Sequence, residues 1–130
     1  MTPAILPSGQ IHEILKFDYA SALYLQNAEF DIAINLDKEK EASALLKVVQ
    51  AKEKYGYILK DNVTQPINDL AFHKYHTGLF DDVSQANTLN YCTEIYQMCG
   101  LTYKGEPYLL DNHANKGFEW PQLDKSKTII

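Results

Sequence analysis

The chain contains no arginine, so all twelve of its basic side chains are lysines. Arginine carries the planar guanidinium that proteins most often use to bind phosphate or carboxylate through two parallel hydrogen bonds. The sequence also has no glycine-rich phosphate loop, no zinc-ligand spacing and no nucleophile elbow. Its lysines are scattered and do not form a basic stripe. These absences argue against nucleotides, phosphopeptides and nucleic acids as partners.

Long hydrophobic runs are also missing, since no stretch approaches the roughly 20 apolar residues that a membrane span needs. We therefore expect no membrane partner. The first ten residues, MTPAILPSGQ, have no basic residue before a short apolar stretch, which is not typical of a secretion signal. A cytoplasmic protein is the expectation, and a periplasmic or secreted one if a leader has been removed.

The composition is that of an ordinary globular protein. The chain has 130 residues, 45% of them hydrophobic and 22% charged, with a formal net charge of −5. This length predicts a single domain over residues 1–130, with a loop over residues 1–10 and an irregular tail over residues 111–130. The mild acidity is compatible with a basic protein partner.

The residue pattern predicts an all-α or mainly α fold, an irregular bundle of about four helices. The first helix is expected from about Ile11 to about Asn35. Its apolar stripe comprises Leu15, Tyr19, Leu23, Phe30 and Ile34. The last third is ambiguous, because Phe30, Ile32 and Ile34 also alternate as in a strand. The absence of glycine and proline from this stretch favours the helix.

A second helix is expected after Asp37, which is a suitable capping residue. Lysine and glutamate occupy its exposed side, and the helix should end between residues 56 and 62. Its apolar face comprises Ala42, Leu45, Leu46 and Val49.

Two shorter helices follow. Pro66 is tolerated in a first helical turn, so a third helix is expected from Thr64 to about His76, with Gly78 as its stop. A fourth is expected over residues 82–100, with an apolar stripe of Leu89, Cys92, Tyr96 and Cys99. Beyond the fourth helix, residues 101–103 and 108–110 flank a turn and are expected to form a short hairpin or an extended tail. The aromatic side chains of Phe118 and Trp120 are expected to pack residues 111–130 against the helical domain.

A divalent metal site is one hypothesis for function. Asp69, His73 and His76 are separated by four and three residues, which places them on one face of a helix. Imidazole and carboxylate are ligands that zinc prefers, and His113 or Asp111 would complete the coordination. The alternative is that both histidines interact with the dipole at the helix C-terminus.

The two cysteines, Cys92 and Cys99, lie seven residues apart. In a continuous helix this spacing separates their Cα atoms by about 10 Å, which is too far for a disulfide. We expect buried thiols. A disulfide would require the helix to end early, and a nucleophilic Cys92 would need His113 and Asp111 beside it.

Nine tyrosines are the other compositional excess. Tyrosine offers a large contact area and a hydroxyl group, and it is enriched at protein interfaces. Tyrosines and carboxylates of the central and C-terminal parts are therefore the predicted partner-binding residues. They are Tyr55, Tyr57, Asp81, Asp82, Glu94, Tyr103, Glu106 and Tyr108.

The leading hypothesis from the sequence is a small acidic protein-binding module of the inhibitor or immunity type, bacterial or from a phage, which masks a larger protein. It predicts no catalytic residue and no cofactor. The first alternative is a metal-binding protein or metal-dependent hydrolase that uses Asp69, His73 and His76. The second is a structural helical subunit or adaptor, whose sign would be a stable homo-oligomer.

Overall fold

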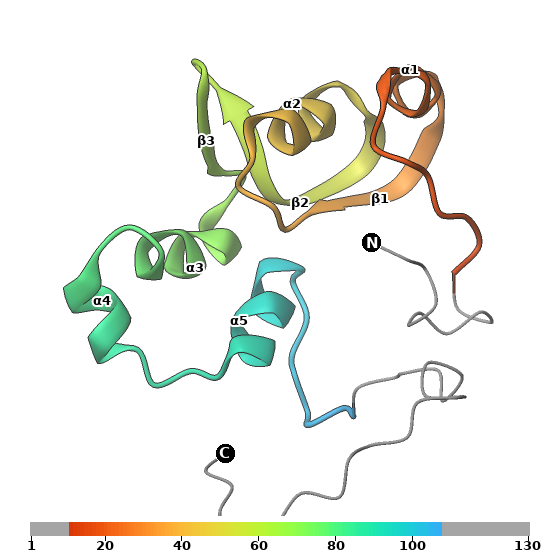
Figure 1. Ribbon diagram of the computed structural model, residues 1–130. Coiled ribbons are helices and arrows are strands. Elements are labelled where there is room, and N and C mark those ends of the chain that lie inside the picture. Colours follow the sequence, from red (N-terminus) through yellow and green to blue (C-terminus); the bar gives the residue numbers. More distant parts are fainter. Residues whose placement is uncertain (1–10, 108–130) are drawn as a thin grey trace, which may run out of the picture. The chain divides into compact units, whose positions relative to one another are not determined.

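The computed structural model describes residues 11–107 of the chain, and within them Leu15–Glu106 form one compact unit (Figure 1). These residues contain five α-helices, one short 3-10 helix and a three-stranded sheet. The prediction of an all-α or mainly α fold is therefore wrong, and the fold is mixed α/β. The strands account for the error, because they replace parts of three predicted helices.

The first predicted helix is in fact a helix followed by a strand. Helix α1 (Tyr19–Asn27) begins after Asp18, whose carboxylate accepts a hydrogen bond from the Ser21 N–H at 3.0 Å. Strand β1 (Glu29–Asn35) takes the place of its last third. The alternation of Phe30, Ile32 and Ile34 indicated this strand. It forms a strand and not a helix because it pairs with residues 50–56, which are distant in the sequence.

The second predicted helix is also shorter than expected. Helix α2 (Lys40–Val48) is followed directly by strand β2 (Gln50–Lys60), which pairs in parallel with β1. Aromatic and β-branched residues favour a strand there. Gly56 has a φ of 94°, and a Cβ atom at this position would lie 1.8 Å from the carbonyl oxygen of Asn35. Only glycine therefore lets β2 approach the end of β1 so closely.

Strand β3 (Val63–Pro66) occupies the predicted start of the third helix and pairs antiparallel with β2. Asp61 and Asn62 between the two strands have φ values of 51° and 62°, the left-handed conformation that tight hairpins require. The strand order is β1-β2-β3, so β2 is central and β1 lies at one edge.

The C-terminal half is helical, in shorter pieces than predicted. The 3-10 helix η2 (Asp69–Ala71) leads into α3 (Phe72–Thr77), and α4 (Asp81–Ala86) and α5 (Tyr91–Met98) follow. The fourth predicted helix is thus broken, because the Asn90 side chain caps α5 by accepting a hydrogen bond from the Thr93 N–H at 2.8 Å. Residues 101–107 form no strand, and residues 108–130, with the rest of the predicted hairpin and tail, lie outside the described residues.

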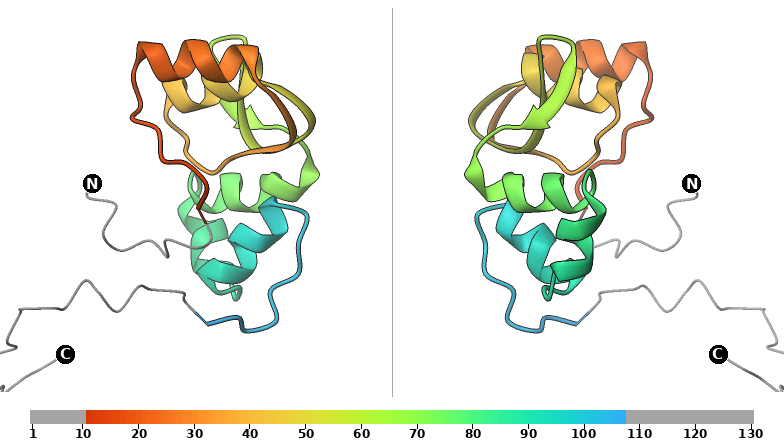
Figure 2. Two further views of the ribbon diagram at one scale, coloured as in Figure 1. Left: turned by 90° about the vertical axis from the view of Figure 1, so that its right-hand side faces the viewer. Right: turned by 90° about the vertical axis from the view of Figure 1, so that its left-hand side faces the viewer.

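Helices lie on both sides of the sheet, with α1 and α2 on one side and α3 and α5 on the other, while α4 packs against α3 (Figures 1 and 2). On the second side, Tyr57 of β2 packs against Ala71 and Met98, and all three are buried. This small cluster joins the central strand to the helices. No helix in the part of the chain that the structure describes is long and apolar enough to cross a membrane.

Candidate functional site

Glu94 lies at the centre of a buried polar network between α3 and α5. Its carboxylate is 3% exposed and accepts a hydrogen bond from the Lys74 ammonium at 2.7 Å. The Thr77 hydroxyl and the Asn87 amide donate to its other oxygen at 3.3 and 3.2 Å. The His73 Nε2 atom lies 3.2 Å from the Asn87 Oδ1 atom and 3.7 Å from Glu94. A buried carboxylate that is hydrogen-bonded in this way holds helices together.

The residues of the predicted metal site have different surroundings. His73 faces the Glu94 network, whereas the ring of His76 packs between two phenylalanines. Among residues 11–107, no group of three or more His, Cys, Asp or Glu side chains could hold a metal ion. His113 and Asp111, the other candidate ligands, lie outside the described residues.

Phe72, His76 and Phe80 form a surface that we call the aromatic patch. The ring centroids of Phe72 and His76 are 4.0 Å apart, and those of His76 and Phe80 are 5.5 Å apart in an edge-to-face arrangement. Phe72 is 48% exposed and Phe80 is 51% exposed. The patch therefore presents large apolar side chains to solvent in a fixed arrangement.

Three exposed carboxylates, which we call the acidic rim, adjoin the patch in the sequence. Asp69 precedes Phe72 by one helical turn, and Asp81 and Asp82 directly follow Phe80 in the first turn of α4. In the described part of the chain, the ion pairs are Lys52–Asp31, His73–Glu94 and Lys74–Glu94. The rim carboxylates take part in none of them, so their negative charge is available to a partner.

The predicted partner-binding residues divide by burial. Asp81 and Asp82 are exposed in the acidic rim, whereas Tyr57 and Glu94 are 1% and 4% exposed. We therefore leave Tyr57 and Glu94 out of the proposed surface. Tyr108 lies outside the described residues.

The other three predicted contacts lie away from the rim in the sequence. Tyr55 is half-buried on β2 and donates a hydrogen bond to the Glu53 carboxylate, which raises the pKa of its hydroxyl. The Tyr103 ring packs edge to face on Tyr96 at 5.1 Å, and Glu106 accepts a hydrogen bond from a backbone N–H at 2.8 Å. The structure does not bring these residues together with Asp81 and Asp82 through any direct contact among the described residues.

Sequence reasoning missed the two phenylalanines of the aromatic patch. Phe72, His76 and Phe80 follow one another at intervals of four residues, which is the spacing of one helix face. The sequence contains this spacing, but His73 and His76 were interpreted as metal ligands and the phenylalanines were not considered.

Burial perturbs two side chains beside the sheet. The Tyr57 hydroxyl is buried without a hydrogen-bond partner among the described residues, and burial raises the pKa of Tyr57 to about 12. The Lys38 ammonium lies 5.5 Å from the ring centroids of both Tyr57 and Tyr75. Partial burial and the nearby Lys74 ammonium lower the pKa of Lys38. These contacts tie the loop before α2 to the helices.

Cys92 and Cys99 are half-buried, and they do not form a disulfide with each other. Burial raises the pKa of the Cys99 thiol, which disfavours the reactive thiolate. The nucleophilic role was considered for Cys92, whose expected partners His113 and Asp111 lie outside the described residues.

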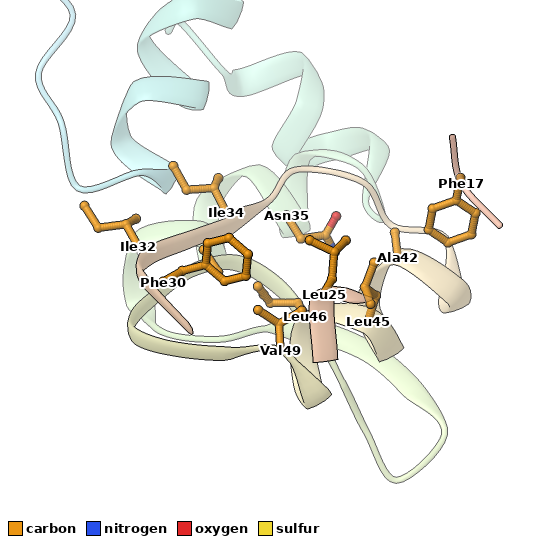
Figure 3. A pocket seen from close by; sticks show the side chains of 11 residues that line it. Phe17, Leu25, Phe30, Ile32, Ile34, Asn35, Ala42, Leu45, Leu46 and Val49 are labelled. Carbon is orange, nitrogen blue, oxygen red and sulfur yellow. The ribbon is translucent and has the colours of Figure 1, made fainter. Parts of the chain in front are cut away.

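A pocket of about 280 Å³ lies beside β1 and is lined by apolar side chains, with Asn35 as the one polar residue (Figure 3). Leu45 and Leu46 of α2 contribute to one side of it, and Ile32 and Ile34 of β1 point away from them (Figure 3). No titratable side chain lines the pocket, so its lining suits an apolar ligand.

Comparison with known proteins identifies no relative of this chain. No protein-family model, no curated protein and no solved structure matches it. A function must therefore be inferred from the geometry of the chain itself.

Proposed function

We propose that this protein is a non-enzymatic binding module of the inhibitor or immunity type, which masks a basic surface of a larger protein. One observation carries the proposal. Phe72 and Phe80 are half-exposed on either side of His76, and three carboxylates that form no ion pair among the described residues adjoin them in the sequence. An apolar centre with a charged border is the usual anatomy of a protein interface.

The side chains of the aromatic patch and the acidic rim favour a basic partner. A lysine or arginine of the partner can place its aliphatic stem on the phenylalanine rings and its cationic head near the rim carboxylates. Asp69, Asp81 and Asp82 would steer such a partner towards the patch and speed its association at low salt. The aromatic rings would supply most of the binding free energy, because buried aromatic side chains are typical hot spots.

The metal-dependent alternative has less support. Its three residues would need to converge on one ion, but His73 interacts with Asn87 and Glu94 while His76 packs between rings. Native mass spectrometry separates the two hypotheses. A bound divalent ion that is lost in His73→Ala would overturn the binding-module proposal in favour of the metal protein.

The proposal can be tested by NMR titration of the full chain with two octapeptides, one of alternating lysine and leucine and one of alternating glutamate and leucine. We expect the lysine peptide to shift amide resonances of residues 69–82, and the shifts to weaken as salt is raised. The glutamate peptide should leave these resonances unchanged.

The matched control uses two pairs of equally exposed residues. Phe72→Ser with Phe80→Ser should reduce the affinity for the lysine peptide at least about tenfold, as expected when two hot-spot rings are lost. Leu23 and Tyr24 on α1 are 48% and 55% exposed, so Leu23→Ser with Tyr24→Ser removes similar apolar surface elsewhere. If both double variants lose the same affinity, or if the amide shifts centre on α1, the peptide binds any exposed apolar surface and the proposed site is wrong.

The natural partner can be sought by photo-crosslinking in cells of the source organism, with Phe80→p-benzoylphenylalanine in the patch. We expect one larger protein to be crosslinked through a surface rich in lysine and arginine. Its yield should fall when Asp81→Asn and Asp82→Asn are added, because these changes remove two rim charges. A crosslink that does not depend on these charges would contradict the proposal.

A further inference from the structure

Strand β1 is an edge strand, because the order of strands is β1-β2-β3 and no other strand among the described residues pairs with its outer side. The apolar pocket extends over this outer edge. Its lining includes Ile32 and Ile34, which lie on one face of β1, and Asn35, which lies on the other (Figure 3). Within residues 11–107, this edge therefore has backbone groups that an added strand could pair with.

The second half of β1 lacks the features that protect edge strands. Natural edges are usually guarded by charged side chains, prolines or bulges. Glu29 and Asp31 place charges in the first half of β1, but Ile32, Ala33 and Ile34 have none. Ile32 is 54% exposed and Ile34 is 49% exposed. By contrast, the opposite edge strand, β3, is short and ends at Pro66.

We propose that β1 is a self-association surface, on which β1 of a second copy pairs antiparallel about a two-fold axis through Ile32. The two three-stranded sheets then become one continuous sheet. A two-fold arrangement uses the same surface on both copies, so it closes as a dimer and does not extend into a filament.

The sequence of β1 is complementary to itself in this register. Ile32 is the midpoint of Glu29–Asn35, so every residue of the strand finds an opposite. Ile32 faces its own copy, and Phe30 faces Ile34, which joins apolar side chains across one face of the sheet. On the other face, Asp31 is opposite Ala33 of the second copy. No two like charges are directly opposed.

The neighbouring registers that keep the faces matched are less favourable. Centring the pair on Asp31 would place two carboxylates directly opposite each other, which is destabilising. Centring it on Ala33 would leave Glu29 and Phe30 opposite residues beyond the end of the strand at Asn35. In the register that we propose, the Asp31 carboxylate keeps its ion pair with Lys52 of the same chain at 2.6 Å.

Sedimentation velocity of the full chain tests the association. The chain has a mass of 14.8 kDa, and we expect a species of twice that mass as concentration rises towards about 1 mM, the weak end of measurable affinities. Ile32→Lys should give the 14.8 kDa species alone, because it opposes two ammonium groups at the axis. Val63→Lys on β3 is the control, since Val63 is 51% exposed on the other edge strand and the dimer should persist. Equal effects of the two changes, or a wild type that remains a monomer, would overturn the proposal.

Cysteine crosslinking tests the register and does not depend on a disruptive substitution. Directly opposite Cβ atoms lie about 5 Å apart, within reach of a disulfide, whereas diagonal neighbours lie roughly 7 Å apart. Under mild oxidation, Ile32→Cys should give a covalent dimer in high yield and Ala33→Cys much less. The wild type, with Cys92 and Cys99, sets the background. Equal yields from the two variants would reject the register.

The dimer proposal and the binding-module proposal can fail separately. The aromatic patch lies outside β1, so Ile32→Lys should leave peptide binding at the patch unchanged.

Discussion

The sheet region, residues 29–66, and the helical region, residues 69–98, are held together in different ways. In the sheet region, backbone hydrogen bonds join β1 to β2 over a continuous parallel register, while side chains such as Ile32 stay half-exposed. In the helical region, α3, α4 and α5 have six, six and eight residues, and helices so short are not stable alone. The stability of the helical region therefore depends on few side chains, and that of the sheet region is spread over the backbone.

Loss of the Glu94 carboxylate should break the helical region and is the largest effect that we expect. Glu94→Ala leaves the partly buried Lys74 ammonium and the Asn87 amide without this acceptor. Removing one partner of a buried ion pair destabilises a protein by about 3–5 kcal/mol. Urea unfolding should show this loss, and hydrogen exchange should show α3 and α5 losing protection before β1 and β2. Glu41→Ala on the exposed side of α2 is the control and should change stability little.

The sheet region has its own critical position at Gly56. Gly56→Ala would push a Cβ atom to 1.8 Å from the Asn35 carbonyl oxygen in addition to straining a φ of 94°. We expect a loss of about 3 kcal/mol, at the upper end for local backbone strain. Gly105 has a similar φ of 88° with nothing within 4 Å of its Cβ position, so Gly105→Ala isolates the strain. That control should lose only about 1 kcal/mol. Equal losses in urea unfolding would show that contact with β1 is unimportant.

Tyr57 connects the two regions and should make their stability sensitive to alkali. Burial raises its pKa from 10.0 to about 12, so the folded protein holds the hydroxyl proton more tightly than the unfolded chain. This contribution is fully present below pH 10.0 and is lost as pH rises through about 12. The loss should be about 2–3 kcal/mol over that range.

Tyr57→Phe should flatten this alkaline decline, and it should raise stability at neutral pH by about 1 kcal/mol because it removes a buried hydroxyl that has no partner among the described residues. Chemical denaturation between pH 7 and about pH 12 measures both effects. Tyr19 is 82% exposed, and Tyr19→Phe should change neither. A Tyr57→Phe variant that is less stable than the wild type at neutral pH would indicate that its hydroxyl is hydrogen-bonded in solution.

The smallest expected effect comes from the exposed ion pair of Lys52 and Asp31. Its atoms are 2.6 Å apart, but both side chains are more than 80% exposed, at 81% and 82%. Exposed pairs contribute little, so Lys52→Ala should destabilise by less than about 0.5 kcal/mol in urea unfolding. If Lys52→Ala lowered the free energy of unfolding as much as Glu94→Ala, the stability of the sheet region would also depend on single side-chain contacts, contrary to the comparison above.

Local patterns predicted some of the elements whose partners are close in sequence. The apolar face assigned to the second helix is buried at Leu46 of α2 and at Val49, the residue that caps its C-terminus. Strand β1 was missed because its partner is distant: Ile34 pairs with Tyr55, and a spacing of four between Phe30 and Ile34 suits either a helix or a strand. Pairing of this kind cannot be read from the pattern of one segment. Strand β3 pairs with β2 across the turn at Asp61 and Asn62, so its partner is close in sequence, and it was missed because Pro66 was interpreted as a helix start.

The same limit applies to the candidate site. Asp81 and Asp82 were identified from their charge, which is a property of single residues. Glu94 was predicted to be a surface residue, and its burial depends on Lys74, which lies 20 positions away in the sequence. The four-residue spacing of Phe72 and His76 could have indicated their contact, but the exposure of Phe72 is known only from the structure.

Because Tyr57 belongs to β2 but is covered by Ala71 and Met98, the order of synthesis on the ribosome bears on how this protein folds. The strand emerges well before α5, and at about 5–20 residues per second the intervening chain takes roughly 2–8 s to make. During that interval the side of β2 that carries Tyr57 is not covered by Ala71 and Met98. The nascent chain is then most exposed to chaperones and to aggregation with its neighbours.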